Sequence, residues 1–191
     1  MDRLDVIVPH INRLLAQKDR VIIAIDGKCT SGKTTLAQRL TEVYDCNLFH
    51  MDDFFLRPEQ RTPQRYAEAG GNVDYERFLE EVLLPLQSGK AFSYRPFDCK
   101  TFTLSAAVTV TPKKLTIIEG TYSCHPYFGQ PYDLKIFLTV TPETQRERIL
   151  QRPAFLHKAF FESWIPMEHA YFEAYAIQDG CHMVCSGQEG A

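Results

Sequence analysis

The stretch Gly27-Lys28-Cys29-Thr30-Ser31-Gly32-Lys33-Thr34 decides the fold. A glycine, four residues and then Gly-Lys-Thr is the spacing of a loop that wraps a phosphate group. Residues 21–25 before it form a short β-branched apolar run typical of a buried strand, and residues 35–40 after it favour a helix. A chance glycine-rich turn would not need these flanks. We therefore predict a nucleotide phosphate site, in which Lys33 reaches the terminal phosphates and the Thr34 hydroxyl binds Mg²⁺.

The composition sets limits on the class of protein. The chain has 191 residues, 45% of them hydrophobic, which is enough for one domain with a core. A net charge of −3 gives no sign of a nucleic acid or a membrane surface as partner. The N-terminus lacks the pattern of a signal peptide, and no apolar run approaches the length of a membrane span. We expect a cytoplasmic protein.

The six cysteines show no paired spacing of a zinc site, and we expect them to be reduced. Cys29 stands apart because it lies within the phosphate loop, where a helix N-terminus can lower the pKa of a thiol. The alternative is that Cys29 is simply a small residue that the loop tolerates.

Strands and helices alternate along the chain, which predicts a mainly parallel sheet covered by helices on both faces. We expect the strand at 47–51 to lie next to the strand at 21–25. The expected helices are 3–17, one from 35, 74–87 with Asp74 as N-cap, one from 142, and 158–177. The expected strands are 21–25, 47–51, 115–120, 134–140 and 181–184, with a hairpin at 92–95 and 108–111 and a loop at 57–73.

Carboxylates follow two of these strands. In a parallel sheet, ligands bind at the carboxyl ends of the strands, where Asp52, Asp53 and Glu119 fall. Asp52 is our candidate for the base that activates an acceptor hydroxyl, and Glu119 for a ligand of Mg²⁺ or of the acceptor. The alternatives are an aspartate pair that caps a turn and a strand-end glutamate exposed to solvent.

Three arginines, Arg146, Arg148 and Arg152, follow the strand at 134–140. They could close over a nucleotide as a lid and neutralise developing charge, or they could be solvated side chains on a helix.

A nucleotide-dependent switch is a different class of function. Its usual strings, Asn-Lys-x-Asp and Asp-x-x-Gly, do not occur.

The chain resembles the uridine kinase, nicotinamide riboside kinase and phosphoribulokinase group of P-loop kinases, over about residues 20–184. Besides the phosphate loop, the resemblance is carried by Met51-Asp52-Asp53-Phe54-Phe55, Ile117-Ile118-Glu119-Gly120, Asp133-Leu134-Lys135-Ile136-Phe137, and Arg148 with Arg152. It implies one α/β domain, residues 1–191, with the three-layer P-loop NTPase fold. An acceptor-binding insert at about 52–112 and a small helical lid at about 146–160 would complete it.

The resemblance also implies an activity, the transfer of the γ-phosphate of ATP, with Mg²⁺, to the 5′-hydroxyl of a nucleoside. Asp52, Lys33 and Arg148 would be catalytic. The implied nucleotide-binding residues are Gly27, Lys28, Cys29, Thr30, Ser31, Gly32, Lys33, Thr34, Thr35, Arg148 and Arg152. The implied acceptor residues are Asp52, Asp53, Phe54, Glu68, Tyr94, Arg95, Glu119 and His125, with Glu68 or Asp74 on the ribose. The implied metal residues are Thr34, Asp52 and Glu119.

The acceptor itself stays open. Uridine kinases recognise the base with a Tyr-Asp pair and a nearby His and Arg, whereas this chain has Tyr94-Arg95-Pro96-Phe97-Asp98. The run Arg57-Pro58-Glu59 is closer to nicotinamide riboside kinases, so that nucleoside or another small molecule is the alternative acceptor. For His125 a surface loop is the alternative to an acceptor contact. A P-loop ATPase and a kinase without activity are the further alternatives for the function, and we leave open that the chain forms a homo-oligomer.

Overall fold

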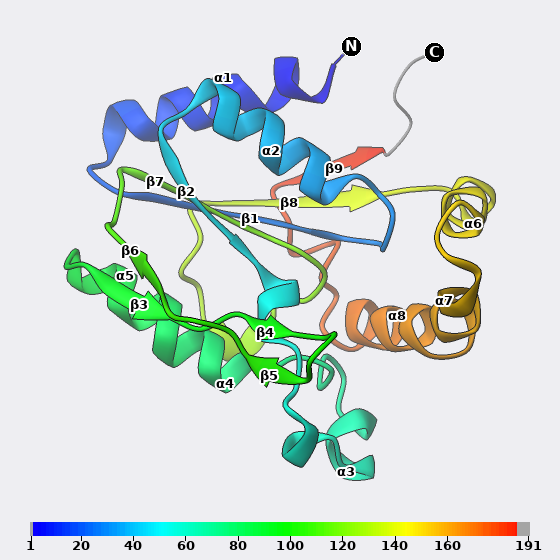
Figure 1. The fold of residues 1–191 in the computed structure, drawn as a ribbon. Coiled ribbons are helices and arrows are strands. Elements are labelled where there is room, and N and C mark those ends of the chain that lie inside the picture. Colours follow the sequence, from blue (N-terminus) through cyan, green and yellow to red (C-terminus); the bar gives the residue numbers. More distant parts are fainter. Residues whose placement is uncertain (1, 187–191) are drawn as a thin grey trace.

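The computed structural model describes residues 2–186, which are built around a five-stranded sheet in the order β2-β7-β1-β8-β9 (Figure 1). The strands are β1 (Val21–Gly27), β2 (Cys46–His50), β7 (Leu115–Glu119), β8 (Leu134–Thr139) and β9 (Met183–Ser186). All four pairings are parallel, and they set Ile25 beside Glu119 on one side and Ile136 on the other. The carboxyl ends of β1, β2 and β7 therefore lie side by side at the same end of the sheet.

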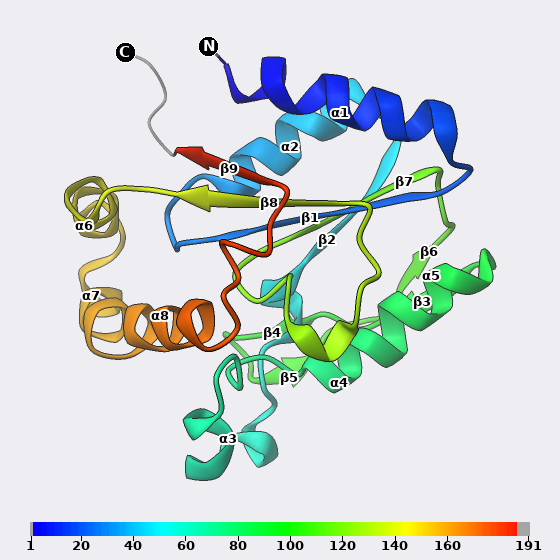
Figure 2. The ribbon, with the colours of Figure 1, turned by 180° about the vertical axis from the view of Figure 1, so that it is seen from behind.

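Helices cover both faces of the sheet, as Figures 1 and 2 show. On one face, α1 (Arg3–Gln17) and α2 (Lys33–Val43) bury Ile7, Ile11 and Leu40 against alternate residues of β1 and β8. On the other face, α4 (Tyr75–Phe78) and α8 (Ile165–Ala174) pack against the opposite sides of the strands. This confirms the predicted α/β fold with a helix-covered parallel sheet.

Two long helical segments contain a wide π-helical turn. One runs from α4 through η3 (Leu79–Leu83) into α5 (Leu84–Ser88), and the other from α7 (Ala154–Ala159) through η5 (Phe160–Trp164) into α8. Each wide turn ends just before a helix whose second residue is a proline, Pro85 or Pro166. Proline has no N–H and clashes with the carbonyl four residues back, and the wider turn moves that carbonyl away.

Smaller elements complete the structure. They are η1 (Met51–Phe54), η2 (Pro58–Gln60), α3 (Pro63–Ala67), η4 (Pro126–Phe128), α6 (Pro142–Leu150), and the antiparallel pairs β3 (Phe92–Tyr94) with β6 (Val108–Val110) and β4 (Phe97–Asp98) with β5 (Thr103–Leu104). The pair β3 and β6 confirms the expected hairpin, and Asp74 caps α4 as expected by accepting from the Arg77 N–H. Residues 57–73 contain two short helices rather than only loop.

The expected neighbour of β1 was wrong, because β7 lies between β2 and β1. Every residue of β7 is buried, which requires an interior position, whereas β2 is mostly half-buried and takes the edge. β9 begins two residues later than expected, at Met183. Within residues 2–186, no helix combines the length and the apolar character that a membrane crossing requires.

Candidate functional site

The phosphate loop joins β1 to α2 and has the backbone geometry that its glycines predict. Gly27 has φ +133°, and a Cβ there would lie 2.0 Å from the Leu138 carbonyl oxygen, so only glycine fits. Gly32 begins α2 in the left-handed region at φ +91°. Thr30 also has a positive φ, +59°, although it carries a side chain. The loop is thus held curled, with the start of α2 at its end.

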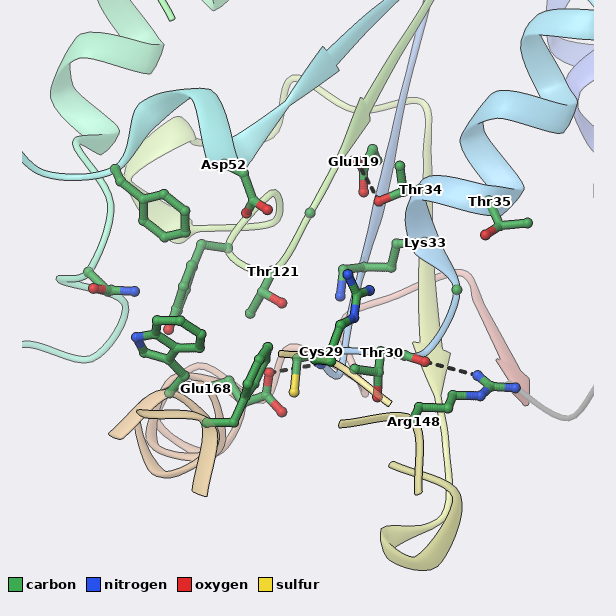
Figure 3. A pocket seen from close by; sticks show the side chains of 18 of the residues that line it. Cys29, Thr30, Lys33, Thr34, Thr35, Asp52, Glu119, Thr121, Arg148 and Glu168 are labelled. Carbon is green, nitrogen blue, oxygen red and sulfur yellow. Dashed lines mark hydrogen bonds between the residues drawn. The ribbon is translucent and has the colours of Figure 1, made fainter. Parts of the chain in front are cut away.

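Two cationic side chains of the predicted nucleotide site lie along this loop (Figure 3). The Lys33 ammonium donates to the carbonyls of Gly27 and Lys28, each at 2.8 Å. Arg148 reaches over from α6 and donates to the Thr30 carbonyl at 2.9 Å. These cations lie where a polyphosphate would need them.

A carboxylate cluster lies beside the loop at the ends of β2 and β7. Glu119 accepts from the Thr34 hydroxyl at 3.1 Å, and the same oxygen lies 2.5 Å from Nδ1 of His50. That hydrogen bond raises the pKa of His50. Burial, and then the charge of Glu119, raise the pKa of the Asp52 carboxyl. A carboxyl with a raised pKa is better suited to accept a proton near neutrality.

The residues present fit a magnesium ion held together with a nucleotide. No group of three or more His, Cys, Asp or Glu within residues 2–186 could hold a metal ion by itself. Mg²⁺ in phosphoryl-transfer sites takes few protein ligands and completes its shell with phosphate oxygens and water. The Thr34 hydroxyl and the Glu119 carboxylate, already in contact, would supply that small protein share.

Asp26 is a buried carboxylate that we did not predict. It is fully buried at the end of β1 and accepts from the N–H groups of Gly27 at 2.7 Å and Cys124 at 2.9 Å. It also accepts from the Tyr122 N–H at 3.3 Å and the Tyr171 hydroxyl at 2.8 Å. Burial raises its pKa to about 6. The sequence carried a signal, because Asp26 ends an apolar strand just as Glu119 does.

Glu168 is a second carboxylate that sequence reasoning missed. It lies on α8, is 2% exposed, and accepts from the Cys29 N–H of the phosphate loop at 2.9 Å. Its other oxygen accepts from the Gln145 side chain at 3.1 Å. Burial, followed by the charge of Glu168, raises the pKa of the Cys29 thiol to about 12. The idea of a lowered thiol pKa at Cys29 is therefore wrong, because burial and a nearby carboxylate outweigh the helix end.

Loop, carboxylates and aromatic side chains together line a cleft of about 1060 Å³. This exceeds the usual volume of a site for one small molecule and leaves room for a nucleotide and an acceptor. The lining residues are Arg3, Cys29, Thr30, Gly32, Lys33, Thr34, Thr35, Asp52, Phe55, Asn72, Phe97, Asp98, Cys99, Glu119, Gly120, Thr121, Tyr122, Arg148, Gln151, Arg152, Phe160, Trp164 and Glu168. Gly27, Lys28 and Ser31 of the loop are not among these lining residues.

Arg3 is another residue that sequence reasoning left without a role. It comes from α1, and its guanidinium donates to the Ser186 carbonyl at 2.9 Å and approaches the Ser31 carbonyl at 3.5 Å. Among the described residues, the cleft has four cationic side chains. Lys33 ends the phosphate loop, Arg3 lies on α1, Arg148 lies on α6, and Arg152 follows α6. The cleft therefore has one cationic end.

Several predicted acceptor residues lie outside this cleft. Phe54 is fully buried and stacks on Tyr94, whose hydroxyl points to Asp53 at 3.5 Å. Arg95 donates to the carbonyls of residues 104 and 105. Glu68 accepts from the Tyr75 hydroxyl at 2.9 Å. The structure does not bring these side chains to the cleft, and it offers Phe55 and Asn72 from the same segments instead.

Asp74 and His125 are also taken up elsewhere. Asp74 is 1% exposed and lies within ion-pair distance of Arg57 and Arg77. His125 is 5% exposed and stacks between Tyr75 and Tyr171, and burial lowers its pKa to about 4. The alternative of a surface histidine is therefore wrong, and the structure does not place His125 among the residues of the cleft.

No protein-family model matches this chain, and no curated protein matches it. Solved structures do match. A possible uridine kinase from Bacillus stearothermophilus aligns with a TM-score of 0.68 at 20% identity, over 93% of this chain and 98% of that one. D-glycerate 3-kinase from Cryptococcus neoformans aligns with a TM-score of 0.66 at 16% identity, over 94% of this chain and 90% of that one.

YFH7 from Saccharomyces cerevisiae is described as a candidate P-loop kinase with a circular permutation. It aligns with a TM-score of 0.68 at 11% identity, over 99% of this chain and 100% of that one. At these identities the likeness establishes the fold. The chain has the three-layer α/β P-loop NTPase fold that the resemblance in its sequence implies.

Proposed function

We propose that this protein is a kinase that transfers the γ-phosphate of ATP, with Mg²⁺, to the 5′-hydroxyl of a nucleoside, as uridine kinases do. The observation that supports this most directly is the meeting of four groups at one cleft. Lys33 and Thr34 of the phosphate loop lie there beside Glu119 and Asp52 (Figure 3). Phosphoryl transfer needs a phosphate cradle, a metal ligand, cations and a carboxylate for the acceptor, and the cleft offers a candidate for each.

The roles follow from position and charge. The loop amides and Lys33 would hold the terminal phosphates, and Arg148 would neutralise charge that develops on the transferred group. Thr34 and Glu119 would hold Mg²⁺, which would supply positive charge against the phosphate groups. Asp52 would orient the acceptor hydroxyl and take its proton, which its raised pKa favours.

The rest of the cleft fits a planar acceptor without phosphate. Its lining there is aromatic, with Phe55, Tyr122 and Trp164, and its polar groups include Asn72 and Asp98. Aromatic side chains stack on a flat ring, and carboxylates repel an anionic acceptor. Nicotinamide riboside is a second candidate, because aromatic faces and carboxylates also attract its cationic ring.

The proposal is tested by ADP release from Mg-ATP with a panel of acceptors. We would use uridine, cytidine, adenosine, nicotinamide riboside, pantothenate, D-glycerate and no acceptor. Release that depends on a nucleoside supports the proposal and identifies the substrate. Equal release without any acceptor would mean an ATPase, and would remove the role of Asp52.

The matched variant is Asp52→Asn, which keeps the shape of the side chain and removes the base. We expect kcat to fall at least about 100-fold, because general bases contribute about 10²–10⁴, while the Kd for ATP stays within about twofold. Asp45→Asn, which is exposed at the opposite end of β2, is the control. A normal kcat in Asp52→Asn would exclude Asp52 as the base.

A further inference from the structure

The Glu168 carboxylate is buried at an unusual place, between the phosphate loop and the acceptor part of the cleft. It comes from α8, which follows the wide turn η5, and it lines the same cleft as Asp52. Figure 3 shows Asp52 and Glu168 on opposite sides of the opening, with Thr121 between them. An acceptor that presents one hydroxyl to Asp52 would thus have Glu168 at its other side.

Both oxygens of the Glu168 carboxylate are held in place by the protein. The Cys29 N–H donates to one oxygen and the Gln145 amide to the other, and the positive charge of Lys33 favours the ionised form. Burying a carboxylate is costly, and here burial outweighs these contacts and raises the pKa of Glu168. Such a group is characteristic of a functional site rather than of packing.

The carboxylate also has unused capacity to accept hydrogen bonds. An ionised carboxylate can accept about four, and the Cys29 N–H, the Cys29 thiol and the Gln145 amide provide three. The cations that line the cleft, Lys33 among them, lie along the phosphate loop and the nucleotide end. A hydroxyl or N–H donor of a bound acceptor would satisfy the remaining oxygen positions, whereas an anionic group would be repelled.

We propose that Glu168 binds a second hydrogen-bond donor of the acceptor, a ring hydroxyl or an N–H group, and so selects donor-rich acceptors over anionic ones. This inference rests on the proposed kinase function. It assigns to α8 a role that the Asp74 carboxylate does not fill, since Asp74 lies outside the cleft in contact with two arginines. Through the Cys29 N–H, the same carboxylate sets the acceptor beside the loop that holds the phosphates.

The test compares Glu168→Gln with the wild-type protein, using whichever panel nucleoside the wild type phosphorylates. We expect the KM for the nucleoside to rise about 10- to 100-fold, as for the loss of a hydrogen bond to a charged group. The Kd for ATP, measured by calorimetry without acceptor, should stay within about twofold. Glu173→Gln, exposed on the same helix, is the matched control and should change neither value.

Three outcomes would overturn the inference. An unchanged nucleoside KM in Glu168→Gln would mean that the acceptor does not contact this carboxylate. A Kd for ATP that weakens as much as the nucleoside KM would mean that Glu168 only holds the loop. Wild-type protein that releases no ADP with any acceptor would overturn the proposed function as well, which separates that failure from the first two.

Discussion

Removing one hydroxyl, in Tyr171→Phe, tests whether Asp26 joins three parts of the molecule. The Tyr171 hydroxyl comes from α8 and donates to the carboxylate at the end of β1 at 2.8 Å, and both side chains are fully buried. The ring stays in place in the variant, so little packing is lost. What changes is a single hydrogen bond to a buried, charged acceptor.

The expected magnitude depends on whether Asp26 is ionised. A hydrogen bond to a charged group contributes about 1.5–3 kcal/mol, and one between neutral groups about 0.5–1.5 kcal/mol. Burial raises the pKa of Asp26 to about 6, so the group is ionised at pH 8 and mostly protonated at pH 5. We expect Tyr171→Phe to lower the free energy of unfolding by about 2 kcal/mol at pH 8 and by about 1 kcal/mol at pH 5.

The sign of the pH effect follows from proton binding. Between about pH 4 and pH 6 the native protein holds a proton on Asp26 that the unfolded chain has released. Asp26 therefore makes the protein less stable as the pH rises through that window. Loss of the hydroxyl raises the folded pKa further, because the hydroxyl favours the ionised form. The variant consequently loses additional stability at the higher pH.

The assay is urea unfolding followed by far-ultraviolet circular dichroism, at pH 5 and at pH 8. In thermal melts, 2 kcal/mol corresponds to about 4–8 °C for a chain of this size. Tyr175→Phe, whose exposed ring lies one turn further along, is the control and should lose less than about 0.5 kcal/mol. A loss in Tyr171→Phe below that value at pH 8, or an equal loss at both pH values, would refute the reasoning.

Two further predictions concern the nucleotide end of the cleft. Iodoacetamide at pH 8 should modify Cys29 at least about 100-fold more slowly than the exposed Cys99, because burial raises the pKa of the half-buried Cys29 to about 12. Peptide mass spectrometry measures both rates, and equal rates would contradict the raised pKa of Cys29. Arg3→Ala should raise the KM for ATP about fivefold without changing the acceptor KM, because Arg3 lines the cleft beside the loop. The control is Arg13→Ala, since Arg13 is exposed on the same helix. An unchanged KM for ATP in Arg3→Ala would mean that Arg3 does not contact the nucleotide.

The sheet and the phosphate loop could be predicted from the sequence because their signals are local. A strand, a glycine-spaced turn and a helix follow one another within residues 21–40, and each has its own periodicity. The order of the strands is not local. Only the full burial of β7 against the partial burial of β2 decides which one lies beside β1, and apolar runs of similar length do not reveal that difference.

The sequence indicated the residues of the candidate site that directly follow strands. It did not indicate those that only tertiary packing brings to the cleft. Asp52 and Glu119 fall at strand ends, so a rule about parallel sheets finds them. Glu168 reaches the loop from a helix 139 residues further along the chain, and nothing in its neighbourhood marks it as buried. Conversely, Tyr94 and His125 looked like acceptor residues because of their place in the sequence, but aromatic stacking holds them in or beside the core.

The wide turn at Phe160–Trp164 makes the length of this segment as important as its composition. Each residue of an α-helix turns the following ones by about 100°. Deleting one residue from η5 would give a regular helix and rotate all of α8, carrying both Glu168 and Tyr171 off their partners at once. Substitutions on the exposed side of α8 would leave both contacts in place, so in this part of the chain a gap in the sequence would be far more damaging than an exchange of side chains.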